Sequence, residues 1–459
     1  MDTIYKQYEA RLKPGNKTGQ EVEAPLAMKN SGKQPSLENV SSMLDAILKI
    51  ERGWKSVSET LLVGGRNSSD YLTSVVKTEE GFKEEVTTDM PIGIMELGLK
   101  PEASLSANEE RLKRRFSVVL EAADMVGIAV LGLGIQPFQK RSFENMMPKQ
   151  RYSYLVGYFG DDLINMTVTA ASQIHLDVSK ENAVETLNAM IGFSPAIIAL
   201  TANSTILEGG IDRHQEFRGT AWDAMARNNT IEDERVGVPE RFATLQKWYY
   251  KISSFKPIFV KRQDNYLYFD SDYRSFSQFS EAGQARTIDI ITGLPTTIKP
   301  GIEDFVTMLG TVWTDARLTG YGTVELRAPA FQPSLEWLMA INALALGLRN
   351  NNGEAKKYLE GYSDSEIKTA RTDAIANGLD ANMGSVPIKE VSREMLKIAA
   401  RGLEDDSDVR YLRPMHHALE EGMNHAVKTR MRFSELKARN LTEEDFVQTF
   451  VREHRFRVA

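Results

Sequence analysis

Four separate stretches of this chain alternate polar with apolar residues, and the polar positions hold acids, an imidazole or an amide. Alternate residues of a strand point to the same face, so each stretch predicts a β-strand with one apolar and one polar face. The stretches are TGQEVEAPLA with Glu21 and Glu23, MPIGIMELG with Glu96, NMTVTAASQIHLDVS with Thr167, Thr169, Ala171, Gln173, His175 and Asp177 on one face, and YGTVELR with Glu325 and Arg327. A solvated face is the ordinary interpretation of any one such strand. Four together indicate a concave sheet whose open face is a site.

Carboxylates gathered on one face of a sheet repel one another unless a cation neutralises them. The chain has no cysteine, which excludes disulfides, thiolate metal sites and thiol nucleophiles. Cages of carboxylate oxygens with an occasional imidazole suit Mg²⁺ or Mn²⁺. A metal held this way, with arginines and lysines nearby, is typical of phosphoryl transfer from a nucleotide.

The composition is that of an ordinary soluble globular protein, with 42% hydrophobic and 26% charged residues in 459. The apolar run GIAVLGLGI is only of strand length, so we expect no membrane span. The first residues lack the apolar block of a secretory signal, and we expect a cytoplasmic protein. The net charge of −7 disfavours nonspecific binding of nucleic acid.

Helical signals lie between the predicted strands. Ser106 and Glu109 are spaced as a capping box, which predicts a helix beginning near Ala107. MMPKQRYSYLVGYFG predicts a helix that opens at a proline, and KENAVETLNAMIGFSPAIIALTAN predicts a helix that covers the apolar side of the sheet. GIAVLGLGIQP predicts a buried strand ended by Pro137, and KPIFVKR predicts a short apolar strand.

From Pro333 to the end of the chain, the pattern becomes helical. Four stretches each predict a helix: PSLEWLMAINALALGL, IKEVSREMLKIAARGL, RPMHHALEEGMNHAVKTRM and TEEDFVQTFVREH. Strands and helices do not alternate regularly enough for a doubly wound fold, so we expect an α+β fold. We expect a catalytic sheet domain over residues 1–330 and a helical C-terminal region over residues 331–459 packed on it.

No conventional nucleotide-binding motif is present in the sequence. It contains no G-x-x-x-x-G-K-[ST], and LGLGIQP fails the dinucleotide fingerprint because Pro137 stands at the third glycine position. If the chain uses ATP, we expect a sheet rather than a phosphate loop to hold it.

Eight motifs follow one another from about residue 18 to residue 330. They are TGQEVEAPLA, MELGLKP, VGIAVLGLGIQPF, MPKQRYSYLVGYF, SQIHLDVS, IIALTANSTILEGG with RGTAW, DERVGVP, and TVWTDARLTGYGTVELR. In sequence and in order they resemble the motifs of glutamate–cysteine ligases of the plant and proteobacterial type. The most specific is MPKQRYSYLVGYF, which resembles that family's M-P-K-x-R-Y stretch.

The resemblance implies the fold of the glutamine synthetase superfamily, a curved and mostly antiparallel sheet that forms a funnel. It also implies a reaction in which ATP phosphorylates the side-chain carboxylate of glutamate, and an amino group then attacks the acyl phosphate to form a γ-glutamyl amide. Divalent ions, Mg²⁺ or Mn²⁺, neutralise phosphate charge in such a transfer. The implied metal ligands are Glu21, Glu23, Glu96 and Glu325, with His175 as a further candidate.

The resemblance also implies roles for the basic residues. Arg218 falls in the R-x-x-x-W motif and is expected to hold the α-carboxylate of glutamate. Arg327 and Arg317 are expected at phosphate, because guanidinium geometry suits that group. The remaining catalytic and substrate candidates are Glu325, Lys149, Arg151, Tyr152, Gln173, Asn203, Ser204 and Trp222. The remaining ATP candidates are Lys261 and His175.

Some of these residues also have a purely structural interpretation. Arg327 can form a salt bridge with Glu325, Trp222 can be core packing, and Asn203 and Ser204 can cap or turn the chain. Lys149 and Arg151 can be surface charges of a helix.

Two positions depart from the family pattern. His175 stands where the family has asparagine, which leaves three roles open: metal ligand, nucleotide contact, or a hydrogen bond within the sheet. Met90 stands where the family has a glutamate, which puts in doubt a metal ligand or a contact to the substrate amine. Thiol-switch regulation, known for some relatives, is excluded because the chain has no cysteine.

The leading hypothesis is an ATP- and Mg²⁺-dependent ligase that makes γ-glutamylcysteine from glutamate and cysteine, the first step of glutathione synthesis, with a homodimer as one assembly. A ligase of the same fold with another amine is the close rival, and Met90 favours it. A phosphotransferase without ligation and a non-catalytic paralogue are further alternatives. The presence of Glu21, Glu96, Glu325 and Arg327 argues against the paralogue.

Overall fold

The computed structural model describes residues 2–458 apart from 64, 65, 69, 229, 230, 264 and 291, and it leaves the side chain of Gln150 undescribed. Its centre is a nine-stranded sheet. The strands are β1 (Thr18–Met28), β2 (Lys55–Val57), β5 (Ser74–Glu79), β6 (Phe82–Thr88), β7 (Ile94–Gly98), β8 (Ile128–Val130), β9 (Ser172–Asp177), β18 (Ala316–Leu318) and β19 (Thr323–Leu326). Their order is β18-β19-β9-β1-β7-β6-β5-β2, with β8 paired to the end of β1. Each of these pairings is antiparallel.

Strand β1 shows why the sheet has two unlike faces. Val22 is buried, whereas Glu21 and Glu23 on either side of it are only partly buried. Glu23 lies opposite Glu96 of β7, and Glu21 lies opposite Gln173 of β9. Residues directly opposite in an antiparallel pair share a face, so polar groups from three strands gather on one face of the sheet, here called the polar face.

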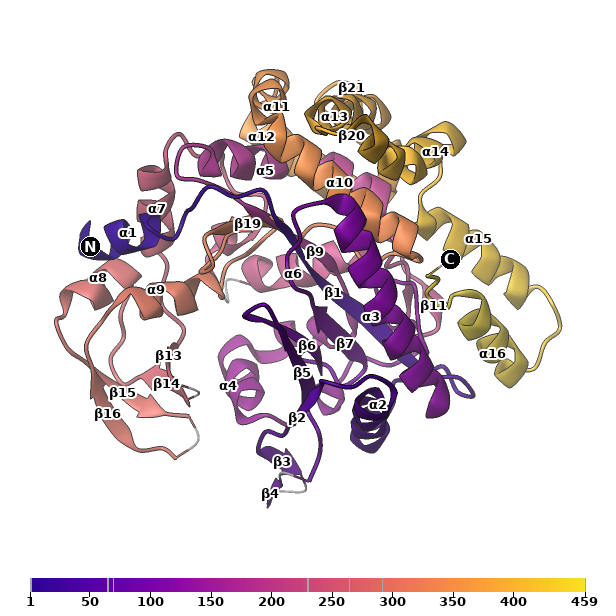
Figure 1. The fold of residues 1–459 in the computed structure, drawn as a ribbon, viewed down its shortest axis with the longest axis horizontal. Coiled ribbons are helices and arrows are strands. Elements are labelled where there is room, and N and C mark those ends of the chain that lie inside the picture. The colour runs from indigo at the N-terminus through magenta and orange to yellow at the C-terminus, as the bar shows by residue number, and fades with distance from the viewer. Residues whose placement is uncertain are drawn as a thin grey trace.

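Helices cover the apolar face of the sheet. Helix α5 (Ala183–Thr201) packs on β18 and β19, α10 (Leu335–Asn350) packs on β9, and α3 (Leu105–Met125) packs on β8. In Figure 1, α3 and α10 lie to the upper right of the sheet, and α4 (Gln150–Phe159) lies to its lower left. Short elements, among them α4 and α6 (Phe217–Arg227), therefore lie on the side of the polar face.

Helix α5 is long and apolar enough, by length and composition, to cross a membrane, so the expectation that GIAVLGLGI is the longest apolar stretch was wrong. In the structure, 89% of its most apolar window is buried inside the protein. It packs against α11 (Asn352–Leu359), α12 (Asp364–Asn377) and α13 (Ile388–Gly402) as well as the sheet. Its hydrophobicity is that of a helix at the centre of a core.

A second, four-stranded antiparallel sheet lies at the lower left of Figure 1. Its strands are β13 (Val260–Arg262), β14 (Asn265–Phe269), β15 (Ala285–Asp289) and β16 (Pro295–Ile298), and near it are α7 (Leu245–Ser253), α8 (Phe276–Glu281) and α9 (Ile302–Leu309). The predicted strand KPIFVKR is confirmed only over its last three residues, which form β13. Tyr154 of α4 stacks on Tyr268 of β14 with ring centroids 5.6 Å apart, which holds this sheet beside α4.

The C-terminal region is helical, as predicted. Beyond α10 to α13 it contains α14 (Arg413–Glu421), α15 (His425–Lys437) and α16 (Glu443–Glu453), with a hairpin of two-residue strands at β20 (Asn382–Met383) and β21 (Val386–Pro387). The single helix predicted for RPMHHALEEGMNHAVKTRM is wrong. Gly422 adopts a left-handed conformation (φ 69°) that ends α14, and the side chain of Asn424 caps α15.

Two further predictions of local structure are wrong. The N-cap of α3 is Ser104, whose Oγ accepts the N–H of Ala107 at 3.2 Å, so the helix begins before the predicted box at Ser106. Residues 160–168 form a 3₁₀ helix instead of continuing the alternating strand. There the hydroxyl of Thr167 donates to the carbonyl of Ile164 at 2.7 Å, a local bond that competes with strand pairing.

The predicted α+β fold with a mostly antiparallel sheet is confirmed. The C-terminal helices share the core with the sheet, because α10 packs on β9 and on α3. The division of the chain near residue 330 stays a prediction.

Candidate active site

Glu325 lies fully buried at the β19 edge of the polar face, between two arginines. Arg317, opposite it on β18, donates from Nε to Oε2 at 2.5 Å, and Arg327 donates from Nη1 to Oε1 at 2.5 Å. Burial alone would raise the pKa of Glu325, but Arg317 and Arg327 hold that pKa well below its usual range. Glu325 is therefore an anion at all ordinary pH values, and the salt bridge predicted for Arg327 exists.

His175 of β9 lies opposite Glu325 and is held from one side only. Its Nδ1 is 3.1 Å from Oγ1 of Thr323, whereas its Nε2 is 3.4 Å from Oε1 of Glu21 and 4.0 Å from Oε1 of Glu325. Nε2 is buried and makes no hydrogen bond with the residues that the structure describes. Burial would lower the pKa of His175, but the Glu21 carboxylate outweighs it and the pKa is raised.

Glu21, His175 and Glu325 fit a divalent cation. One ligand atom from each lies within 4.8 Å of the others, and the set consists of carboxylate oxygens and an imidazole nitrogen. A metal-binding histidine commonly has its second ring nitrogen held by another group, as Thr323 holds Nδ1 here. Both oxygens of Glu325 already accept a bond from an arginine, so a cation would use the lone pairs that remain.

A second group of acids, Glu23, Glu96 and Asp89, lies on the same face. Nε2 of Gln173 donates to Oε1 of Glu23 at 2.5 Å, and Oε1 of Gln173 accepts from Nη1 of Arg327 at 2.7 Å. Burial, together with the charge of Asp89, raises the pKa of Glu23 to about 7 and that of Glu96 well above its usual value. Mutual repulsion of this kind is what a bound divalent cation relieves.

Asp89 is a residue that sequence reasoning missed. It follows the end of β6, and burial raises its pKa. Met90, at the position where the family has glutamate, is only 8% exposed and packs in the core. Asp89 thus supplies negative charge next to the position where the glutamate is missing. The sequence FKEEVTTD carried the signal, because Glu85, Thr87 and Asp89 continue the alternation of partly buried positions in β6.

Arg218, near the start of α6, is a buried cation whose side chain has no partner among the described residues. It is 6% exposed, and its guanidinium makes no hydrogen bond or salt bridge to the described parts of the chain. Burial lowers its pKa, and the nearby charge of Glu23 acts in the opposite direction. A buried guanidinium of this kind is suited to bind an anionic ligand.

Asn203 and Ser204 lie next to the start of α6, where Arg218 is, and make buried hydrogen bonds. Nδ2 of Asn203 donates to the carbonyls of Gly132 and Phe331 at 2.9 and 2.7 Å. Oγ of Ser204 donates to Oε1 of Glu216 at 2.6 Å and accepts the N–H of Arg218 at 3.1 Å. Both side chains thus stabilise the turn that leads into α6, which agrees with their structural interpretation, and a substrate contact stays a prediction.

The predicted residues of α4 lie at its N-terminal end. Nζ of Lys149 is 2.7 Å from Oε1 of Glu59, and burial lowers the pKa of this lysine. Arg151 donates from Nη2 to the hydroxyl of Tyr152 at 2.8 Å. Its guanidinium and the ammonium of Lys261 lie 5.8 and 5.6 Å from the ring centroid of Tyr266, so two of the predicted cations meet at one aromatic ring.

Trp222 stacks on Trp313 with ring centroids 5.4 Å apart and an angle of 22° between the planes. This contact accounts for packing and leaves the predicted substrate contact untested. A cavity of about 810 Å³ lies nearby, between α7, α12 and the strand β18. Arg317 is its single described wall residue that also belongs to the acid–arginine cluster, so the cluster lies on the polar face and not around this cavity.

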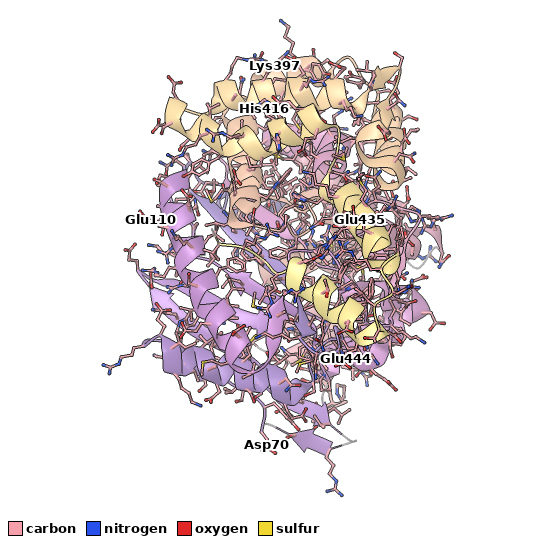
Figure 2. The ribbon with its side chains drawn as sticks, turned by 90° about the vertical axis from the view of Figure 1, so that its right-hand side faces the viewer. Asp70, Glu110, Lys397, His416, Glu435 and Glu444 are labelled. Carbon is pink, nitrogen blue, oxygen red and sulfur yellow. The ribbon has the colours of Figure 1, made fainter. Side chains whose placement is uncertain are left out.

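His416 and His417 are exposed on α14, and Figure 2 shows His416 among the C-terminal helices. They are surface residues. The residues that the structure does bring together on or beside the polar face are Glu21, Glu23, Asp89, Glu96, Gln173, His175, Arg218, Arg317, Glu325 and Arg327. The individual roles assigned to them stay predictions.

Comparison with known proteins identifies the family. The model of glutamate–cysteine ligase family 2 matches residues 58–448 of this chain. The chain belongs to that family. The resemblance inferred from the eight motifs is confirmed.

Two curated relatives illustrate the similarity. The chloroplastic glutamate–cysteine ligase of Arabidopsis thaliana is 27% identical over 331 residues, which are 68% of this chain and 59% of the relative. The corresponding enzyme of Medicago truncatula is 26% identical over 386 residues, which are 80% of this chain and 68% of the relative. The chain thus spans about three fifths to two thirds of the length of these relatives.

Solved structures are more distant. The glutamate–cysteine ligase of Francisella tularensis, in complex with AMP, covers 96% of this chain and 88% of its own, with a TM-score of 0.48 and 10% sequence identity. The bifunctional glutathione synthetase of Pasteurella multocida covers 99% of this chain and 53% of its own, with a TM-score of 0.47 and 10% identity.

Proposed function

We propose that the chain is an ATP-dependent ligase that joins the side-chain carboxylate of glutamate to the amino group of cysteine. The observation that carries this proposal is the cluster of Glu21, His175 and Glu325, whose ligand atoms lie within 4.8 Å of one another and which Arg317 and Arg327 flank. Membership of glutamate–cysteine ligase family 2 and the names of the relatives support glutamate and cysteine as the substrates.

The proposed cofactor is Mg²⁺ or Mn²⁺. Glu21, His175 and Glu325 would hold one ion, and Glu23, Glu96 and Asp89 would hold another. When bound, such ions neutralise the charge of the ATP phosphates and of the group in transfer.

The chain's own residues would orient the two reacting groups. Arg218, which is buried and has no side-chain partner among the described residues, would bind the α-carboxylate of glutamate. Arg327 and Arg317 would hold phosphate oxygens on the side where Glu325 fixes their guanidinium planes. The glutamate γ-carboxylate attacks the γ-phosphorus of ATP and releases ADP. The amine nitrogen then attacks the acyl carbon, and the C–O bond to phosphate breaks as the amine loses a proton to water.

The experiment that tests this chemistry uses glutamate labelled with ¹⁸O in its γ-carboxylate. If the acyl phosphate forms, one labelled oxygen leaves with inorganic phosphate when the amide is made. Release of ADP with only unlabelled phosphate would contradict the proposal, and a stable phosphorylated product without amide would indicate a phosphotransferase. The cytoplasmic location and the homodimer stay predictions from the sequence.

A further inference from the structure

Arg371 of α12 is a buried arginine that joins two elements of the polar face. Its side chain is 5% exposed. Nη1 donates to both carboxylate oxygens of Asp223, at 2.9 and 2.8 Å, and Nε donates to Oδ2 of Asp315 at 2.7 Å. Bonds of this kind, charged on both sides and out of water, are strong and fix direction as well as distance.

Each of the two acids is linked through the main chain to a proposed substrate arginine. Asp223 lies in α6, five residues after Arg218. Asp315 lies between β17 (Trp313–Thr314) and β18, and its main-chain carbonyl accepts the N–H of Arg327 at 2.8 Å. Arg371 is therefore the bridge from the helix of Arg218 to the backbone beside Arg327.

The bridge opposes a repulsion. Arg218 and Arg327 are buried and close enough that the charge of Arg327 lowers the pKa of Arg218, after the larger effect of burial, while the charge of Asp315 raises it. Without a brace, two like charges in a low dielectric would favour moving apart. The guanidinium of Arg371 is closely packed, because a Cβ built on Gly237 would lie 3.2 Å from Cζ of Arg371.

We infer that Arg371 is a positioning residue that sets the separation between Arg218 and Arg327. The inference rests on the proposed function, in which Arg218 binds the α-carboxylate and Arg327 binds the phosphate on the side-chain carboxylate. The separation of the two guanidinium groups then measures the length of the amino-acid side chain. It selects glutamate over aspartate, which is shorter by one methylene.

The test compares glutamate with aspartate in ATP-dependent ADP release by the full chain, with cysteine present. Arg371→Lys keeps the positive charge and removes the fork that holds both acids. We expect kcat/KM for glutamate to fall about tenfold or more, because a misplaced substrate-binding group lowers the rate. We also expect the preference for glutamate over aspartate to fall about tenfold, because the two acids differ by one methylene. The matched control is Arg115→Lys, which removes another buried arginine, a residue of α3 that bridges Glu84 and Glu51.

A loss of stability alone would lower the yield of folded protein in both variants but would leave the glutamate-to-aspartate ratio at the wild-type value. If Arg371→Lys does not fold, Asp223→Asn serves instead, because it keeps the size of the side chain and weakens one arm of the bridge. An unchanged ratio in the folded variant would overturn the inference while the wild-type activity stands. Absence of turnover in the wild-type protein with either acid would overturn the proposed function itself.

Discussion

Nε2 of His175 lies 3.4 Å from Oε1 of Glu21, across two neighbouring antiparallel strands, and makes no hydrogen bond with the described residues. The ring cannot turn away without losing the contact of Nδ1 with Thr323 at 3.1 Å. A buried imidazole nitrogen that lies beside carboxylates and makes no hydrogen bond with the described residues is suited to coordinate a metal ion. Metal affinity is therefore the property on which mutations at this site are expected to act first.

Glu21→Gln removes one charged ligand and keeps the size of the side chain. We expect Mn²⁺ affinity to fall about tenfold or more, since hard cations prefer charged oxygen ligands, and turnover to fall with it. Titration of free Mn²⁺ by electron paramagnetic resonance measures the affinity directly. Glu444→Gln on α16, at the surface shown in Figure 2, is the control and keeps the wild-type value. Equal Mn²⁺ affinity in both variants would show that Glu21 is not a ligand.

His175→Asn and His175→Ala separate the ligand role from packing. The resembled family has asparagine at this position, and an asparagine oxygen can still bind a hard cation. We expect His175→Asn to keep more Mn²⁺ affinity and more activity than His175→Ala, by about tenfold. The same titration and ADP release measure both. Equal losses in the two variants would indicate that the ring matters for the sheet and not for the metal.

Arg218→Lys keeps the charge and loses the planar fork. If Arg218 binds the α-carboxylate, the KM for glutamate rises about 10- to 100-fold while the KM for ATP is unchanged, because only one substrate loses a bidentate contact. Steady-state kinetics with each substrate varied in turn gives both constants. A larger rise in the KM for ATP would move Arg218 to the nucleotide.

Glu216 makes the stability of the protein depend on pH. Burial raises its pKa from 4.5 to about 7, so the folded state binds this proton more tightly than the unfolded state does. Its contribution to stability is therefore most favourable below pH 4.5 and is lost as the pH rises to 7, by about 3 kcal/mol. Glu216→Gln cannot ionise.

Denaturant unfolding at pH 5 and at pH 8 tests this expectation. The wild-type protein should lose more free energy of unfolding between the two pH values than Glu216→Gln does. The other carboxyl groups titrate in both proteins and cancel in the comparison. An identical loss in the two proteins would contradict a raised pKa at Glu216.

The sequence could predict most of the polar face, because its signal is local. The alternation in TGQEVEAPLA and YGTVELR places Glu21, Glu23 and Glu325 on one face, and the antiparallel register then brings them together. The family motifs pointed to Arg218, which the structure shows to be buried and without a side-chain partner among the described residues.

What the sequence could not predict depends on contacts between distant segments. Arg371 reaches Asp223 from 148 residues away, and no periodicity within α12 indicates that bond. The strand predicted through Thr167 failed because a local hydroxyl bond can stabilise a helical turn with the same polar pattern. The alternation that runs through β6 leads to Asp89, whereas the family motif leads to its neighbour Met90.

The most direct test of the central claim is ADP release from ATP and Mg²⁺ with glutamate and with each candidate amine in turn, followed by identification of the product by mass. The account predicts ADP in stoichiometric amount with γ-glutamylcysteine when cysteine is the amine, and its loss in Glu21→Gln. ADP release with a different amine would keep the chemistry and change the substrate. No ADP with any amine would contradict the account.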